Sequence, residues 1–202
     1  MLTNDEKVLK TKCEKDLLFY SRYIYKENTR RNFIVAPHFR LISDALMKVI
    51  RGETKRLIIN IPPRYGKTEL AVKNLIGYGL AINPQSKFIH ISYSDDLALD
   101  NSSQAKEYVE SDAFQKFWQM KLKKDAQGKK KWFNEDGGGV YATASGGAIT
   151  GFGAGVADSN EFSGAIIIDD PLKPDDAISE VKRKSVNERY NSTIRSRVND
   201  SN

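Results

Sequence analysis

Hydrophobic positions in the N-terminal quarter of the chain recur with the spacing of amphipathic helices. The first predicted helix lies within residues 14–25, and the residues on its apolar face are Leu17, Leu18, Ser21, Ile24 and Tyr25. A second helix is predicted from Pro37, a residue tolerated in a first helical turn, to Gly52, a common helix stop. We expect these helices to form an N-terminal segment, residues 1–52, that packs on the rest of the chain.

Apolar runs and helical periods alternate through the remainder of the chain, residues 53–202. Short strands are predicted at residues 57–60, 87–93, 140–144 and 165–168. Helices are predicted at residues 71–82, at residues 97–111 and, as one long element, from Pro174. This order predicts a single α/β domain in which a mostly parallel sheet lies between two helical layers, a three-layer α/β/α sandwich.

The loop after the strand predicted at residues 57–60 carries residue types that bind a triphosphate. Its sequence is Ile61-Pro62-Pro63-Arg64-Tyr65-Gly66-Lys67-Thr68. In a phosphate-binding loop, backbone N–H groups and a helix N-terminus surround the phosphates, a lysine reaches the β- and γ-oxygens, and a hydroxyl binds Mg²⁺. Gly66, Lys67 and Thr68 fit the end of that pattern. Ile61 replaces its first glycine, so the match is degenerate.

Two acidic residues follow the strand predicted at residues 165–168. This apolar run predicts a short, fully buried strand, with Asp169 and Asp170 at its carboxyl end. In nucleotide hydrolases of this layout the first acid holds Mg²⁺, and the next orients or deprotonates the attacking water. Taken alone, Gly-Lys-Thr is also typical of an ordinary helix start, and Asp-Asp of a core strand that meets a turn. The two motifs in this order favour a nucleotide site.

Composition limits the class of protein without deciding its activity. The chain has 202 residues, of which 29% are charged. It contains no apolar run near the roughly 20 residues that span a bilayer, and its N-terminus lacks the apolar region of a signal peptide. A single cysteine, Cys13, excludes a cysteine-rich zinc site and indicates a reducing cytoplasm. The net charge of +6 favours a polyanionic partner only modestly.

Three further segments have two interpretations each. Six lysines between residues 121 and 131 precede Trp132-Phe133, which indicates either a basic hairpin that contacts nucleic acid or a solvated connection whose aromatic residues pack on the sheet. The glycine-dense loop at residues 145–155 either approaches a nucleotide or DNA closely or is only a flexible turn. The arginines of the C-terminal helix either contact phosphate or a subunit or lie on a solvated face, and they are Arg183, Arg189, Arg195 and Arg197.

The two histidines of the chain are interpreted mainly as structural residues. His90 alternates with apolar neighbours, so it is predicted to be a satisfied strand residue rather than a metal ligand. His38 lies just inside a predicted helix start and is interpreted as a surface or capping residue. A position beside a bound base is the alternative for His38.

Three motifs in this chain resemble those of the large terminase subunit of tailed double-stranded DNA bacteriophages. They are residues 61–69, residues 146–151 (Gly-Gly-Ala-Ile-Thr-Gly) and residues 167–173 (Ile-Ile-Asp-Asp-Pro-Leu-Lys). The similarity extends from about Pro37 to Arg197. It implies the N-terminal ATPase domain of a DNA-packaging motor, a P-loop NTPase of the additional-strand, conserved-glutamate (ASCE) type. Such a motor hydrolyses Mg-ATP to move double-stranded DNA through a portal into a procapsid.

The resemblance also implies roles for individual residues. The nucleotide-binding set that it implies is Pro63, Arg64, Tyr65, Gly66, Lys67, Thr68 and Glu69. Thr68 and Asp169 are implied as the Mg²⁺ ligands. Asp170, which stands where many such ATPases have a glutamate, is implied as the catalytic base. Lys67 and Arg64 are implied as further catalytic residues, with Arg64 sensing the state of the nucleotide.

Lys106 stands where relatives often have an arginine finger that reaches the neighbouring subunit's γ-phosphate, and lysine keeps the charge but loses the two-pronged donor geometry. The sequence ends soon after Arg197, so we expect a truncated ATPase domain without the family's coupling motif and C-terminal nuclease. The implied cofactors are ATP and Mg²⁺. The implied partners are double-stranded DNA, further copies in a homo-oligomeric ring, the portal protein and the small terminase subunit, in the host cytoplasm and without a membrane.

Two other functions are kept as alternatives. One is a helicase-like ATPase that depends on nucleic acid, and the other is a nucleotide-binding assembly module whose degenerate loop does not support hydrolysis. ATP hydrolysis measured with and without double-stranded DNA separates these functions. Unwinding of a forked duplex identifies the helicase, and tight ATP binding without turnover identifies the assembly module.

Overall fold

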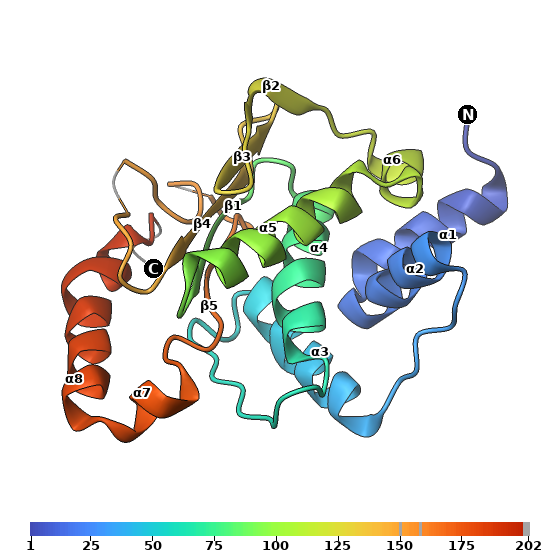
Figure 1. The fold of residues 1–202 in the computed structure, drawn as a ribbon. Coiled ribbons are helices and arrows are strands. Elements are labelled where there is room, and N and C mark those ends of the chain that lie inside the picture. The colour runs from blue at the N-terminus through green and yellow to red at the C-terminus, as the bar shows by residue number, and fades with distance from the viewer. Residues whose placement is uncertain (150, 158, 200–202) are drawn as a thin grey trace.

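The computed structural model describes residues 1–149, 151–157 and 159–199, and its strands form a five-stranded sheet (Figure 1). The strands are β1 (Lys87–Ser92), β2 (Leu122–Gln127), β3 (Lys131–Asn134), β4 (Gly139–Ala144) and β5 (Ile166–Ile168), in the order β2-β3-β4-β1-β5. β1 pairs in parallel with both β4 and β5. β3 pairs in antiparallel fashion with β2 and with β4. The predicted α/β fold is confirmed, but the prediction of a mostly parallel sheet is wrong, because the described sheet has as many antiparallel as parallel pairings.

The strand predicted at residues 57–60 is not among the strands of this sheet in the described part of the chain. Leu57 and Ile59 pack against the core, whereas Ile58 is 84% exposed. The segment therefore keeps the alternating burial of an extended chain without a strand partner. β5 consequently lies at an edge of the sheet, and Ile168 is 37% exposed. The prediction of a fully buried strand before the acidic pair is wrong at this residue.

The helices are α1 (Asn4–Lys15), α2 (Leu17–Thr29), α3 (Pro37–Ile50), α4 (Leu75–Ile82), α5 (Asp95–Glu110), α6 (Asp112–Trp118), α7 (Pro174–Ile178) and α8 (Glu180–Arg189), with π-helical turns η1 (Glu69–Asn74) and η2 (Tyr190–Ile194) and the 3-10 turn η3 (Arg195–Arg197). The first predicted helix is divided at Asp16, whose carboxylate accepts a hydrogen bond from Phe19 N and caps α2. The long C-terminal helix is interrupted at Ser179, whose hydroxyl caps α8. No described helix is long and apolar enough to cross a membrane.

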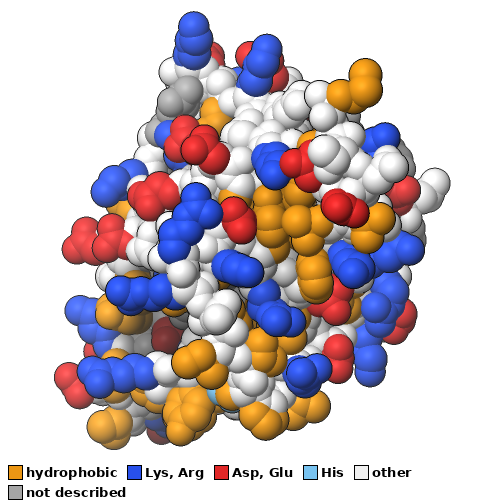
Figure 2. All heavy atoms as spheres, turned by 90° about the vertical axis from the view of Figure 1, so that its right-hand side faces the viewer, with side chains coloured by type: hydrophobic (Ala, Val, Ile, Leu, Met, Phe, Trp, Pro, Cys, Tyr) orange, Lys and Arg blue, Asp and Glu red, His pale blue; other side chains and the backbone are white. Residues whose placement is uncertain are grey.

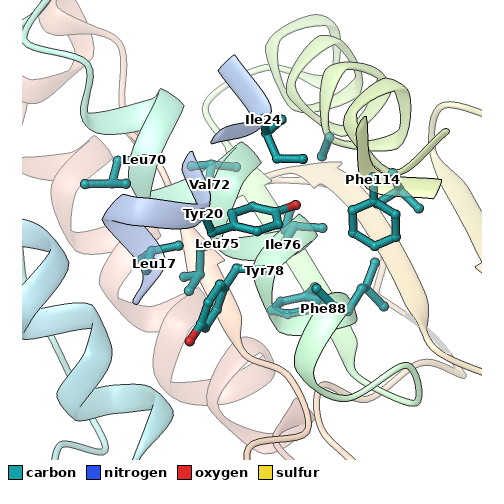
Figure 3. Packing of buried hydrophobic residues seen from close by; sticks show 14 of the residues in the cluster. Leu17, Tyr20, Ile24, Leu70, Val72, Leu75, Ile76, Tyr78, Phe88 and Phe114 are labelled. Atoms are coloured by element: carbon teal, nitrogen blue, oxygen red, sulfur yellow. The ribbon is translucent and has the colours of Figure 1, made fainter. Parts of the chain in front are cut away.

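A helical layer covers one face of the sheet, and α4 lies at its centre (Figure 3). Every residue from Leu75 to Ala81 is buried. A Cβ atom at Gly79 would lie 2.5 Å from Phe88 Cζ, so the absence of a side chain lets α4 approach β1 closely. Tyr78 of α4 donates a hydrogen bond to the Glu14 carbonyl at 2.7 Å. The N-terminal helices and the sheet therefore share one hydrophobic core.

The opposite face of the sheet has a different cover. Ile89 and Ile91 of β1 pack there with Ile149, Phe152 and Ala154 of the glycine-dense loop and with Ile194 of η2. The cover is thus a loop and a π-helical turn, with α8 on this side of the strands (Figure 1). The apolar side chains of the loop belong to the core, which neither interpretation of the loop anticipated. Thr150 of this loop lies outside the described residues.

The lysine-rich segment forms the hairpin of β2 and β3. Trp132 is fully buried, and its Nε1 donates a hydrogen bond to the Ser102 hydroxyl at 3.0 Å. Phe133 packs against Phe152 on the other face, with ring centroids 5.7 Å apart. The structure therefore supports the interpretation in which the aromatic residues pack on the sheet. The lysines of the hairpin are exposed.

The surface carries charges of both signs. Figure 2 shows the side of the molecule that lies to the right in Figure 1, where α1, α2 and α6 are found. Lysine and arginine side chains alternate there with acidic ones around patches of hydrophobic residues. On this side, the net charge of +6 is not gathered into a single basic field.

Candidate functional site

The loop after residue 61 and the acidic pair after β5 meet in space. Lys67 Nζ donates a hydrogen bond to Asp170 Oδ1 at 2.5 Å and lies 3.5 Å from Asp169 Oδ1. The Thr68 hydroxyl donates to Asp169 Oδ2 at 2.8 Å. The residues joined by these hydrogen bonds are 103 and 101 positions apart. The fold therefore brings together the ammonium, the hydroxyl and both carboxylates that the sequence singled out.

The backbone after β5 explains how two consecutive carboxylates reach one lysine. Asp169 N donates a hydrogen bond to Ile91 O at 2.8 Å, which continues the pairing with β1 by one residue. Successive side chains of a strand point to opposite faces. Asp170 breaks this alternation with a left-handed backbone, at a φ of 45°, a conformation that aspartate tolerates better than most residues. Asp169 is 5% exposed, while the side chain of Asp170 is 56% exposed.

The loop itself has two residues in the left-handed region, Arg64 at a φ of 68° and Gly66 at a φ of 72°. A Cβ atom at Gly66 would lie 2.6 Å from Phe39 Cζ, so glycine is required both by the backbone angle and by the close approach of α3. His38, also on α3, forms a hydrogen bond between its Nε2 and the Tyr65 carbonyl at 3.0 Å. α3 therefore fixes the shape of this loop, and His38 is one of its anchors.

The helical segment that follows the loop presents its N-terminus beside Lys67. Thr68, directly before η1, already has a helical backbone and its side chain makes no capping hydrogen bond, while its hydroxyl donates to Asp169. The first N–H groups of a helix have no partner within the helix, and the helix dipole favours negative charge at that end. Residues 67 and 68 are already helical, and Leu70 N donates to the Gly66 carbonyl at 3.1 Å, so an anion at this helix start would meet the N–H groups that precede Leu70 and the Lys67 ammonium.

The charges of the cluster are arranged to keep Lys67 protonated. Partial burial lowers its pKa, but the hydrogen bond to Asp170 and the charges of Asp169 and Asp170 outweigh burial and raise the pKa above its ordinary value. The Thr68 hydroxyl and the Asp169 carboxylate are hard oxygen ligands of the kind that Mg²⁺ prefers. The described residues contain no group of three or more His, Cys, Asp or Glu that could hold a metal. A Mg²⁺ ion that also binds substrate phosphates needs only one or two protein ligands, so these residues fit it.

Other members of the predicted set lie differently. Pro63, Arg64 and Tyr65 are exposed on the outer side of the loop. The Glu69 carboxylate instead faces α5, where it accepts a hydrogen bond from the Tyr108 hydroxyl at 2.5 Å and pairs with Lys73 at 3.2 Å. Its carboxylate links η1 to α5, so the structure does not place it toward the candidate phosphate position.

Lys106 lies in the last turns of α5. Asp95, in the first turn of α5, accepts a hydrogen bond from Ala144 N at the end of β4, so this helix begins at the carboxyl ends of the strands. Lys106 lies eleven residues further on, which is about 16 Å at the rise of an α-helix. Its ammonium lies 3.8 Å from a Glu110 carboxylate oxygen. Tyr108, two residues beyond Lys106, contacts Glu69, so this part of α5 packs against η1.

His90 lies beneath the site, and the sequence predicted its burial but not its position next to Asp169. His90 of β1 is fully buried and its Nε2 lies 3.3 Å from Asn101 Nδ2 of α5, but its buried Nδ1 has no hydrogen-bond partner among the described residues, so the prediction of a satisfied strand residue holds for only one ring nitrogen. Burial lowers the pKa of His90 to about 4, and the nearby charge of Asp169 opposes that shift. His90 is therefore neutral at pH 7. Its place next to Asp169 depends on the pairing of β1 with β5, which no local pattern reveals.

Protein-family models and curated protein sequences were compared with the chain. No family model matches, and no curated protein matches. The function of the site is therefore inferred from its residues and their geometry, together with the motifs that resemble the terminase family.

Proposed function

We propose that this chain is a Mg²⁺-dependent ATPase domain with the architecture of a P-loop NTPase of the ASCE type. The observation that carries the proposal is the convergence of Lys67 and Thr68 with Asp169 and Asp170. The convergence lies at the carboxyl end of a parallel strand, where open α/β sheets bind their ligands. A loop lysine, a hydroxyl and two acids are the parts that phosphoryl transfer needs in this layout.

Each residue has a distinct role in this proposal. Lys67 binds the β- and γ-phosphates, and Thr68 and Asp169 hold Mg²⁺. The bound ion supplies charge neutralisation for the phosphate oxygens. Asp170, which is the more exposed acid, orients the attacking water and accepts its proton. Because the Lys67 ammonium donates to Asp170, the phosphates have to draw that ammonium away before Asp170 is free to act on water.

The order of the three motifs supports a narrower proposal. Residues 61–69, 146–151 and 167–173 occur in the order found in large terminase subunits, so we place the chain with the motors that drive double-stranded DNA into a procapsid. The proposal includes assembly into a homo-oligomeric ring that meets a portal protein and a small terminase subunit. In such a ring, Lys106 is proposed to act on a neighbouring subunit's γ-phosphate, the role that the resemblance implies for this position.

The test is ATP hydrolysis by the purified chain in the presence of Mg²⁺, with and without double-stranded DNA. We expect Lys67→Ala to lower kcat by about 100-fold or more, because it removes a cation from the position of the transferred phosphate. The matched control is Lys12→Ala, which removes an exposed lysine of α1 far along the chain from the loop and is expected to leave kcat unchanged. Equal rates for Lys67→Ala and the wild type would refute the proposed site.

Two outcomes of the same assay favour the alternatives. ATP binding without turnover, even at high protein concentration and with DNA present, identifies a nucleotide-binding assembly module. Hydrolysis stimulated by single strands and coupled to unwinding of a forked duplex identifies a helicase-like enzyme. Stimulation by intact duplex without unwinding supports the packaging motor.

A further inference from the structure

A separate cavity lies next to the acidic pair. It is an open hollow of about 190 Å³ lined by residues 171–173, which directly follow Asp170, by Ser145 and Gly146 of the glycine-dense loop, and by α7 and α8. None of Lys67, Thr68, Asp169 and Asp170 lines it. The cavity is therefore a second concave site, formed where three segments of the chain meet.

The charged groups of this cavity are mainly cations. Lys173, Lys182 and Arg189 line it, against one acid, Asp176. Lys182, Ser185 and Arg189 follow each other at intervals of three and four residues, so they lie on one face of α8. Lys173, from the segment before α7, also lines the cavity, and its Nζ lies 5.8 Å from the centre of the Tyr93 ring. The lining thus combines cations from two segments of the chain with the hydroxyls of Ser145 and Ser185.

Arg189 shows that the site has unused donor capacity. One Nη2–H donates to the Gly147 carbonyl, which ties α8 to the glycine-dense loop. Its Nε is buried and has no hydrogen-bond partner among the described residues. A buried guanidinium N–H without an acceptor is unfavourable, and its natural partner is an anionic oxygen. Arg183 differs, because it donates to the Ala177 and Ile178 carbonyls and so braces the corner between α7 and α8.

We propose that this cavity binds a phosphate group, held by Lys173, Lys182 and Arg189. Its volume of about 190 Å³ is below the roughly 300–1,000 Å³ of pockets that enclose whole small molecules, so it fits a phosphate or a sugar-phosphate unit rather than an entire nucleotide. Arginine and lysine with neighbouring hydroxyls are the usual donors to phosphate oxygens. The phosphate comes either from a nucleic-acid backbone or from free inorganic phosphate.

The experiment is a titration of the full chain with inorganic phosphate, followed by the backbone amide signals in NMR spectra. Signals of Gly146 and Ser185 report this cavity, whereas those of Gly66 and Thr68 report the loop at Lys67. We expect saturable shifts of the Gly146 and Ser185 signals, and about a tenfold weaker apparent affinity for them in Lys182→Ala, because one charge-assisted contact is lost. Lys184→Ala removes the same charge from another face of α8 and is the matched control, with less than about a twofold effect.

A second titration identifies the source of the phosphate. A short DNA duplex that shifts the same signals and competes with inorganic phosphate shows that the source is a nucleic-acid backbone. Saturation by inorganic phosphate without displacement by duplex shows that it is free phosphate. Equal weakening by Lys182→Ala and Lys184→Ala, or no saturable shift at Gly146 and Ser185, would overturn the proposal. Arg189→Lys keeps the charge but loses the Nε donor, so it is expected to weaken phosphate binding. Amide signals outside the cavity are expected to stay in place, which shows that the variant is folded.

None of these readouts requires ATP hydrolysis. If Lys67→Ala left hydrolysis unchanged, the proposed ATPase site would fail while the phosphate titration of the cavity would still be decisive. If the Gly146 and Ser185 amide signals did not shift while ATP hydrolysis depended on Lys67, the phosphate-binding proposal would fail and the ATPase proposal would stand.

Discussion

The two faces of the sheet are built in different ways. On the helix-covered face, the side chains of β1 meet α4, which is buried from Leu75 to Ala81, and α1 to α3 extend the same core (Figure 3). On the loop-covered face, β1 meets the glycine-dense loop and the short turn η2. The first face has continuous helices, while the second has a smaller cluster of aliphatic side chains together with the aromatic rings of Phe133, Tyr141 and Phe152.

The helix-covered face is therefore expected to stabilise the fold, and the loop-covered face is expected to rearrange more readily. Dense helical packing is stable and tolerates little change in volume, whereas a loop cover has fewer contacts that must break when it opens. The acidic pair follows β5 at the sheet edge, and the cationic cavity lies on the side of the loop and α8. We therefore expect the free energy of unfolding to depend chiefly on the helix-covered face, and ligand responses to appear on the loop-covered face.

The largest contrast is expected from the same substitution on each face. Ile76→Ala, in α4 at 0% exposure, should lower the free energy of unfolding by about 4 kcal/mol, because the surrounding helices cannot close the cavity. Ile194→Ala, in η2 at 3% exposure, should lower it by about 2 kcal/mol, because a short turn can relax into the space. Urea unfolding measures both values. Equal losses would show that the two faces are equally rigid.

A pH effect of intermediate size is expected from His90, which faces the helical layer. Its pKa is lowered to about 4, while an unfolded histidine titrates near 6.5, so the unfolded chain binds more protons between these values. Stability from this residue is fully present above about pH 6.5 and falls as the pH approaches 4, with about 2 kcal/mol lost by pH 5. Comparison of the unfolding free energies at pH 7.5 and 5 with those of His90→Gln isolates this contribution. An unchanged pH dependence in the variant would contradict it.

The smallest contrast is expected from two glycines. Gly79→Ala should destabilise the fold by about 1–2 kcal/mol, because the new Cβ atom would meet Phe88 Cζ at 2.5 Å, and this outweighs the better helix propensity of alanine. Gly146→Ala, on the loop, has no heavy atom within 4 Å of the new Cβ atom and should be neutral or slightly stabilising. Thermal unfolding of both variants distinguishes the two environments. A stable Gly79→Ala variant would mean that Phe88 can move aside.

Much of the fold follows from local patterns in the sequence. The apolar runs at β1, β4 and β5 and the proline start of α3 appear where the hydrophobic pattern places them, within one or two residues. The sequence also predicted the meeting of Lys67 with Asp169, although it placed the loop after a strand at residues 57–60 that the sheet does not contain.

Other features depend on contacts that no local pattern contains. Residues 57–60 have the composition of a strand, yet a strand requires a hydrogen-bonding neighbour. Trp132 was as compatible with stacking on nucleic acid as with burial until the position of Ser102 in α5 was known. Glu69 stands next to the loop in sequence but is turned away by Tyr108, which lies 39 residues later. The cavity near Arg189 forms where three separate segments of the chain meet. The sequence alone therefore showed only that Arg189 was one of several arginines that could contact phosphate.

The positions of the aromatic side chains also determine what optical methods can detect. Both tryptophans, Trp118 and Trp132, pack into the helix-covered core, and neither belongs to the cluster beneath the glycine-dense loop. Intrinsic tryptophan fluorescence therefore reports unfolding of the helix-covered core. It does not report local opening of the loop-covered face. A probe placed near Phe152 would be needed to observe the second event by fluorescence.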